Sequence, residues 1–146
     1  ALENTEGIEY LSRLFEAFSD RECVGFCWDT GHEMCYNWSE DVVDRFGQNG
    51  KLFATHLNDN LGIRDFEGKI TWIDDLHLLP FDGIADWKGI AERLDRAGFD
   101  GTMTFELNTK SKPGRHENDK YDKMDIEQYV TEVYIRACRL AAMRKR

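Results

Sequence analysis

Apolar residues follow one another along the chain with two alternating spacings. Short continuous apolar runs are typical of buried strands in a parallel sheet. These runs are 23–28, 52–57 and 102–105. Between and after them, apolar residues three or four positions apart predict helices. These helical segments are about 6–18, 39–47, 84–97 and 125–143. The alternation predicts an α/β fold with parallel strands and outer helices.

The two ends of this pattern carry further expectations. Asn4 or Thr5 is a candidate cap for the first helix, and Ser39 for the second. The opening segment 1–4 is typical of a strand end, and the chain lacks an initiator methionine. Together these features predict a fragment, a processed product or a truncated reading frame. The 146 residues are enough for a single domain over 1–146 with a packed core.

Charge and cysteine usage narrow the possible partners. The formal net charge of -9 argues against nucleic acid or an anionic membrane as an electrostatic partner. No apolar run reaches the length of a membrane helix. The four cysteines form no CxxC motif. We therefore expect reduced, mostly buried thiols in a cytoplasmic protein rather than a zinc-thiolate site.

Each predicted strand ends in a residue that can bind a metal ion. These residues are Glu3, Asp29, His56 and Glu106. Ligands of parallel α/β folds gather at the carboxyl ends of the strands, so these side chains are expected to converge. Two glutamates, an aspartate and a histidine suit Mn²⁺, Mg²⁺ or Zn²⁺. Taken singly, each has a plainer interpretation as a loop residue, a helix cap or a structural histidine.

A long polar loop over 58–83 carries a second set of candidates. Asp75 and His77 are two residues apart and would share a face if the segment is extended. His32 follows Asp29 by three residues across a glycine. By contrast, His116 is expected to be a solvated loop residue. The basic cluster 110–115 could bind a substrate phosphate, although a solvated loop is the favoured interpretation.

Five stretches together resemble one known superfamily. They are ALEN, VGFCWDTGH, LFATHLNDN, DDLHLLPFDGIADW and GFDGTMTFEL. As a set they resemble the xylose isomerase-like TIM-barrel superfamily, and most closely its sugar phosphate isomerase/epimerase branch. The resemblance implies an eight-stranded barrel, of which this chain would supply about strands 4–8, a half barrel.

The same resemblance implies a site and a mechanism. Glu3, Asp29, His56 and Glu106 would bind a divalent Mn, Zn, Mg or Co ion. Glu3 and Glu106 would also be the catalytic acid/base pair, moving a proton next to a sugar carbonyl through a cis-enediolate. His32 would contact substrate or a second metal, and Arg64 is a weaker candidate for orienting substrate hydroxyls. Asp75 and His77 match a pair that binds further zinc in the endonuclease branch.

Three functions therefore remain open. The favoured one is a metal-dependent sugar or sugar-phosphate isomerase or epimerase. An endonuclease IV-like zinc phosphodiesterase is the first alternative, which the acidic charge opposes. The second is an inactive half barrel that only folds, dimerises or binds metal. An open half barrel would expose strand edges, so a homodimer that completes or covers it is a further expectation.

Overall fold

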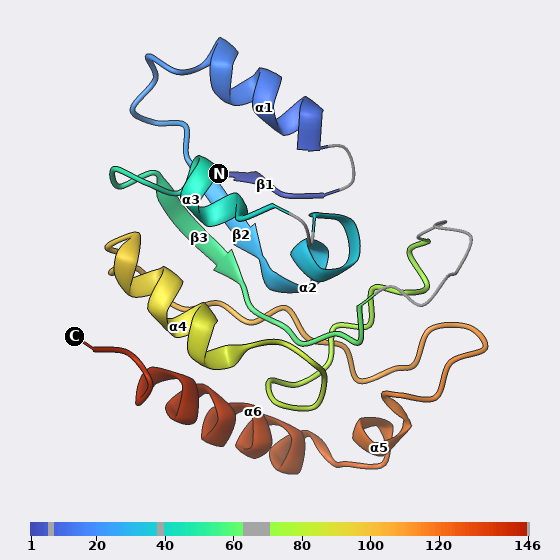
Figure 1. Ribbon diagram of the computed structural model, residues 1–146. Helices are drawn as coiled ribbons and strands as arrows, with labels where there is room; N and C mark the ends of the chain where they lie inside the picture. The colour runs from blue at the N-terminus through green and yellow to red at the C-terminus, as the bar shows by residue number, and fades with distance from the viewer. Residues whose placement is uncertain (6–7, 38–39, 63–70, 146) are drawn as a thin grey trace.

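The computed structural model describes residues 1–5, 8–37, 40–62 and 71–145. Its sheet has three parallel strands in the order β1-β2-β3. They are β1 (Leu2–Glu3), β2 (Phe26–Asp29) and β3 (Leu52–His56). The helices lie around the sheet, with α1 at one end of the molecule and α6 at the other (Figure 1). The α/β class with parallel strands is confirmed, whereas the assignment to strands 4–8 of a barrel remains a prediction.

Four helices correspond to those that the apolar spacing predicts. They are α1 (Ile8–Ala17), α3 (Val42–Phe46), α4 (Trp87–Arg96) and α6 (Ile126–Ala141). Ser39, the predicted cap of the second helix, lies outside the described residues. The described helix begins at Val42, and the Asp41 side chain caps it by accepting the Asp44 N–H. Three short helical elements have no apolar period and escape prediction. They are α2 (Thr30–His32), the π-helical η1 (Glu33–Asn37) and α5 (Asp119–Asp122).

The segment 102–105, predicted as the last strand, forms a single bridge instead. Leu57 and Phe105 pair in parallel, and the Leu57 N–H donates to the Thr104 carbonyl oxygen at 2.8 Å. The Thr55 hydroxyl accepts from the Thr104 N–H at 3.0 Å and lies 3.4 Å from the Thr104 carbonyl oxygen. Because this side chain occupies backbone groups that a longer ladder would use, pairing stops there. The carboxyl end of the segment nevertheless lies beside that of β3.

Buried apolar side chains form two separate cores. The larger core lies between the sheet and its helices, and includes Phe26 and Trp28 of β2 and Leu94 of α4. The smaller core joins the loop after β3 to α5 and α6. Its buried members are Leu76, Leu78, Leu79, Tyr121 and Tyr129. The long loop after β3 is therefore packed in its second part, although Trp72 is exposed.

The cysteines only partly follow expectation. All four thiols are free, but Cys27 and Cys35 alone are buried, while Cys23 and Cys138 are exposed. Burial raises the pKa of Cys27 and of Cys35 to about 12. No cysteine joins a metal-type cluster among the described residues. Within the same residues, no helix combines the length and apolar character needed to cross a membrane.

Candidate metal centre

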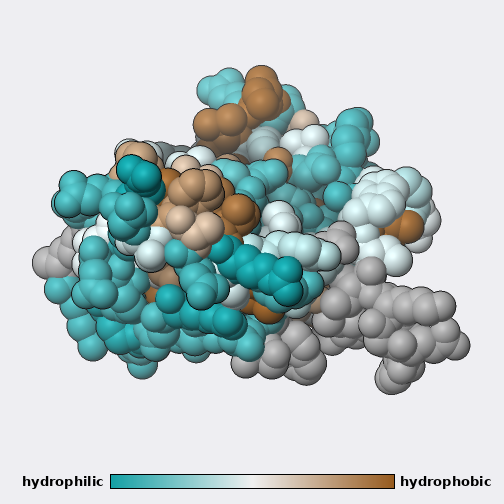
Figure 2. Space-filling view, turned by 90° about the horizontal axis from the view of Figure 1, so that it is seen from above, coloured by the Kyte–Doolittle hydropathy of each residue, from teal (hydrophilic) through white to brown (hydrophobic). Residues whose placement is uncertain are grey.

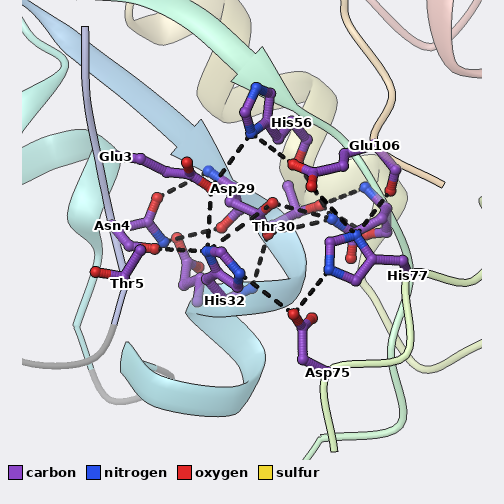
Figure 3. A network of polar contacts seen from close by, with 12 residues as sticks. Glu3, Asn4, Thr5, Asp29, Thr30, His32, His56, Asp75, His77 and Glu106 are labelled. Carbon is purple, nitrogen blue, oxygen red and sulfur yellow. Dashed lines mark hydrogen bonds and ion pairs between the residues drawn. The ribbon is translucent and has the colours of Figure 1, made fainter. Parts of the chain in front are cut away.

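The carboxyl ends of the parallel strands bring four predicted side chains together (Figure 3). Glu3 ends β1, Asp29 ends β2, His56 ends β3 and Glu106 follows the bridged segment. The strand register explains the meeting, since Asp29 pairs with His56 and Glu3 pairs with Cys27. One ligand atom from each of the four lies within 4.8 Å of the others. We call these four residues the first cluster.

His56 lies between the two glutamates of the first cluster. Its Nδ1 atom is 3.2 Å from Glu3 Oε1 and 2.7 Å from Glu106 Oε2. Carboxylates brought this close repel each other unless a positive charge lies between them. Carboxylate oxygens and an imidazole nitrogen form a donor set that suits Mn²⁺, Mg²⁺ or Zn²⁺. The residues present therefore fit a divalent cation.

Asp29 is the fully buried member of the first cluster. Its Oδ1 atom accepts the His32 backbone N–H at 2.7 Å, so the carboxylate also caps α2. Asn58 Nδ2 lies 3.2 Å from each oxygen of this carboxylate. Burial raises the pKa of Asp29 to about 6, against the opposing effect of nearby His32. Asp29 is thus a helix cap, as its plainer interpretation predicts, and the capping bond also holds its carboxylate at the end of β2.

His32, Asp75 and His77 form a second cluster beside the first, with one ligand atom each within 4.8 Å of the others. The Nε2 atoms of His32 and His77 lie 3.3 and 2.7 Å from Asp75 Oδ2. Their Nδ1 atoms lie 2.9 Å from the Asn4 carbonyl oxygen and 3.1 Å from that of Glu106. In each ring, a hydrogen bond between Nδ1 and a backbone carbonyl oxygen leaves Nε2 facing Asp75. Such an arrangement is common for metal-binding histidines.

Charge pairing dominates the second cluster. Burial disfavours a charged His32, yet hydrogen bonds to Asp75 and Glu3 raise its pKa to about 11. The pKa of His77 also rises, because its contact with Asp75 outweighs burial. Conversely, burial would raise the pKa of Asp75, but both histidines hold it well below its usual range. Asp75 Oδ1 is buried without a hydrogen-bond partner in the described structure, so this oxygen has spare capacity for a cation.

The two clusters form one continuous network, as Figure 3 shows. His32 Nδ1 lies 3.1 Å from Glu3 Oε1 and 4.0 Å from Asp29 Oδ2. On the other side, His77 Nδ1 lies 4.0 Å from Glu106 Oε1. His32 therefore belongs to the second cluster by its Nε2 atom and touches the first by its Nδ1 atom.

The backbone of the loop that carries the second cluster is unusual. His77 has a φ of 51°, in the left-handed region that residues other than glycine rarely adopt. Such a conformation costs about 1–3 kcal/mol and needs support from its surroundings. The support comes from Asn108 N–H, which donates to the His77 carbonyl oxygen at 3.0 Å, and from Asn118 Nδ2, which donates to that of Leu76 at 3.1 Å.

The remaining predicted residues take no part in either cluster. Arg64 lies outside the described residues. His116 is exposed, as expected, and its Nδ1 lies 2.9 Å from Asp119. In the basic cluster, Lys110 pairs with Asp122 and Arg115 pairs with both Asp74 and Glu117. These acidic partners favour the solvated-loop interpretation over a phosphate site.

Buried polar residues that support the ligands escaped the sequence analysis. The Thr30 hydroxyl donates to the Asn58 carbonyl oxygen at 2.6 Å and accepts the Asn58 N–H at 2.9 Å. The Asn4 side chain bonds to the backbone of Asp29. The predicted cap of the first helix at Asn4 or Thr5 stays a prediction, because positions 6 and 7 lie outside the described residues. The sequence offers one signal that could have revealed the supporting asparagines: Asn4 and Asn58 come one and two residues after the predicted ligands Glu3 and His56.

Fold and side chains together define an α/β protein with two adjacent metal-type clusters at the carboxyl ends of parallel strands. The chain belongs to the xylose isomerase-like TIM barrel family, whose model matches residues 1–126. It is also 34% identical over 100 residues to a Sinorhizobium fredii protein named uncharacterized protein y4fM. That match covers 68% of this chain and 28% of the relative, so the chain spans less than a third of the relative's length. The expected superfamily is thereby confirmed.

Proposed function

We propose that the chain carries the metal-binding core of a divalent-metal-dependent isomerase or epimerase of sugars or sugar phosphates. Its family is commonly enzymatic and often binds divalent metals. The first cluster carries the proposal, because two glutamates, an aspartate and a histidine converge there. Glu106 and His56 keep 47% and 32% of their side-chain surface exposed, which leaves room for a substrate to approach.

Glu3 and Glu106 are the proposed proton-transfer pair. They approach His56 from β1 and from the bridged segment, so two carboxylates face one place. A bound cation would polarise the sugar carbonyl and acidify the neighbouring C–H bond. One glutamate would accept that proton, giving a cis-enediolate. Return of the proton to the opposite face gives an epimer, and its return to the neighbouring carbon gives an isomer.

Two further residues are proposed to contact the substrate. His32 lies within the network at 15% side-chain exposure and would orient a substrate hydroxyl through its ring. Arg64 keeps the same proposed role, although it lies outside the described residues. Both assignments are tested by the same sugar screen as the carboxylates, since loss of a hydroxyl contact raises KM for the full substrate.

Elemental analysis of the purified protein tests the proposal first. We expect about one Mn, Zn or Co ion per chain at the first cluster, because a preformed donor set binds without further ordering. Glu106→Ala should lose this ion, while Glu92→Ala, an exposed glutamate on α4, should keep it. A screen of aldoses, ketoses and their phosphates follows. A metal content that is the same in Glu106→Ala as in the unmodified protein, or no turnover by the loaded protein, would contradict the proposal.

The second cluster favours one other candidate function. Two imidazoles and an aspartate form a zinc-type donor set beside the first cluster, as a zinc phosphodiesterase acting on abasic DNA would need. The net charge of -9 opposes it, because a DNA-binding surface is normally basic. Zinc-loaded protein is therefore tested on an abasic duplex. Nicking that disappears in His77→Ala would favour this function over the isomerase.

We also propose a homodimer that covers exposed apolar side chains. Residues spaced by four lie on one helix face. On α1 and just beyond it they are Tyr10, Leu14 and Phe18, and on α6 they are Ile126, Val130 and Tyr134. Figure 2 looks down on the α1 side, where apolar residues lie among polar ones. A sedimentation mass of two chains is expected. A monomer without turnover would support the inactive half barrel instead.

A further inference from the structure

Asn4 is a fully buried side chain that lies beside Glu3, Asp29 and His32 without belonging to either cluster (Figure 3). Its Oδ1 atom accepts the Asp29 N–H at 2.8 Å, and its Nδ2 atom donates to the Asp29 carbonyl oxygen at 2.9 Å. Backbone pairing between β1 and β2 ends two residues earlier on β2, at Glu3 and Cys27. The amide presents one donor and one acceptor to Asp29, as a peptide group would, so it extends the pairing to that residue.

The backbone of Asn4 connects the same place to the second cluster. Its carbonyl oxygen lies 2.9 Å from His32 Nδ1, which leaves Nε2 of that ring facing Asp75. Glu3 is its neighbour in the chain. One residue therefore adjoins Glu3, Asp29 and His32, which stand on three different elements.

A second buried asparagine holds Asn4 in place. Asn4 Nδ2 also donates to Asn37 Oδ1 at 3.1 Å, and Asn37 Nδ2 donates to the Thr5 carbonyl oxygen at 3.2 Å. Asn37 stands at the end of the π-helical turn η1 and is 3% exposed. Single π-helical turns are frequent at functional sites. Here the turn supplies a fixed partner for the Asn4 amide.

We infer that Asn4 is a positioning residue that holds Glu3 and Asp29 in register for metal binding, an inference that rests on the proposed function. The chemistry of an asparagine is required at this position. Aspartate has no donor for the Asp29 carbonyl oxygen, and alanine has neither the donor nor the acceptor. Glutamine carries the same amide one methylene further from the backbone.

Hydrogen exchange tests the geometric half of the inference without any metal. The measured quantity is the exchange rate of the Asp29 amide relative to that of the Phe26 amide. Phe26 lies on the same strand, β2, and its N–H donates to the Lys51 carbonyl oxygen. Global destabilisation would speed both, whereas loss of the Asn4 acceptor speeds Asp29 alone. Asn4→Ala should raise this ratio by about tenfold, which corresponds to the loss of one hydrogen bond.

The matched control is Asn118→Ala. Asn118 is fully buried, and its Nδ2 also donates to two acceptors, the carbonyl oxygens of Leu76 and Asn108. It touches neither Asp29 nor Phe26, so the exchange ratio should stay within about twofold of the unmodified protein. A ratio that is equally high in both variants, or unchanged in Asn4→Ala, would overturn the inference.

Cobalt titration tests the functional half. Each variant is made in a His77→Ala background, so that the visible absorption of Co²⁺ reports the first cluster alone. Asn4→Ala should weaken Co²⁺ binding by about 10–100-fold, the usual effect of losing a residue that orients metal ligands. Glu92→Ala, an exposed glutamate on α4, should leave Co²⁺ binding unchanged. Asn37→Ala, which keeps both contacts to Asp29, should give a smaller loss and serves if Asn4→Ala does not fold.

The outcomes separate this inference from the proposed function. If the unmodified protein binds no Co²⁺, the proposed metal site is wrong and the positioning role falls with it, whatever the exchange ratio shows. Normal Co²⁺ affinity in Asn4→Ala, with faster Asp29 exchange, would make Asn4 structural only. Faster exchange and weaker binding together support the positioning role.

Discussion

The two clusters use similar side chains but are built by different parts of the molecule. The first cluster takes its donors from the ends of strands and of the bridged segment, so the register of the sheet sets their positions. The second takes one donor from α2 and two from a loop. That loop is held by the smaller core and by distant residues such as Asn118, which lies 42 positions after Leu76. Backbone pairing thus positions one cluster, and distant side-chain contacts position the other.

The clusters also differ in their access to solvent. In the first, Glu106 and His56 are 47% and 32% exposed. In the second, His77 and Asp75 are 11% and 10% exposed. Catalytic metal sites keep an open position for substrate, whereas structural sites are closed by protein ligands. The comparison therefore supports the proposal that chemistry takes place at the first cluster and that the second has a supporting role.

Asp29→Ala is the change with the largest expected effect, because Asp29 serves both clusters. It contributes a carboxylate to the first and holds the His32 backbone N–H with the same group. We expect Zn²⁺ affinity to fall by more than about 100-fold at the first cluster and by about tenfold at the second. Titration calorimetry measures both. Asp20→Ala, an exposed aspartate 71% accessible, is the control and should bind normally.

Single histidine variants should separate the clusters. His56→Ala removes a donor of the first cluster, and His77→Ala removes one of the second. Each is expected to lose about one Zn²⁺ per chain while the other ion is retained, because the two donor sets share no residue. Isomerase turnover should disappear only in His56→Ala. Loss of both ions in either variant would show that the clusters form one site.

The first cluster was predictable because each of its residues stands at a position that the local sequence pattern marks. A polar residue that ends an apolar run is visible in the sequence, and parallel strands bring such ends together. That reasoning placed Glu3, Asp29 and His56 correctly on strand ends. It failed for the strand 102–105, where the hydroxyl of Thr55 takes the backbone groups of Thr104. A side chain that interrupts pairing from another strand leaves no mark in the pattern.

The second cluster was predicted for a reason that is wrong in part. Asp75 and His77 were expected to share a face of an extended segment, but His77 has a left-handed backbone with a φ of 51°. The two side chains meet because distant residues hold this turn. The role of Asn4 was equally hidden, since its partners Asp29 and Asn37 are 25 and 33 positions away. Such contacts follow from the tertiary fold and not from spacing.

Tyr121→Phe should loosen the second cluster and leave the first intact. The Tyr121 hydroxyl donates to Asp82 Oδ2 at 2.5 Å and accepts the Leu79 N–H at 3.2 Å, which ties the loop to α5. Removing it leaves the buried Leu79 N–H unpaired and takes one hydrogen bond from Asp82, which keeps its contacts with Lys120 and Arg136. We therefore expect a loss of about 1–3 kcal/mol in the free energy of unfolding. Urea denaturation measures this, and Tyr10→Phe, 66% exposed, should cost less than about 0.5 kcal/mol. Equal costs would contradict the loop attachment.

Asp82 contributes a pH-dependent part of the stability, and this is the most specific of the predicted effects. Burial would raise the pKa of Asp82, but Tyr121, Arg136 and Lys120 together lower it. The folded state therefore binds fewer protons than the unfolded state in acid, so this stabilisation is full above the usual carboxylate pKa of about 4. It is lost as the pH falls further, through the lowered folded pKa.

Asp82→Asn isolates this contribution from the other carboxylates. The variant should be less stable than the unmodified protein by about 1–3 kcal/mol at neutral pH, because charged hydrogen bonds to Arg136 and Lys120 are lost. The difference should shrink as the pH falls below about 4, because the carboxyl is then protonated in the unfolded state. It should be smallest below the lowered folded pKa, where the native carboxyl is protonated as well and resembles the amide. Urea unfolding at several pH values measures it. A difference that stays constant with pH would mean that the charge of Asp82 does not hold the loop of the second cluster. The contrast between the first cluster, positioned by the sheet, and the second, positioned by a loop, would then rest on Tyr121 and the smaller core.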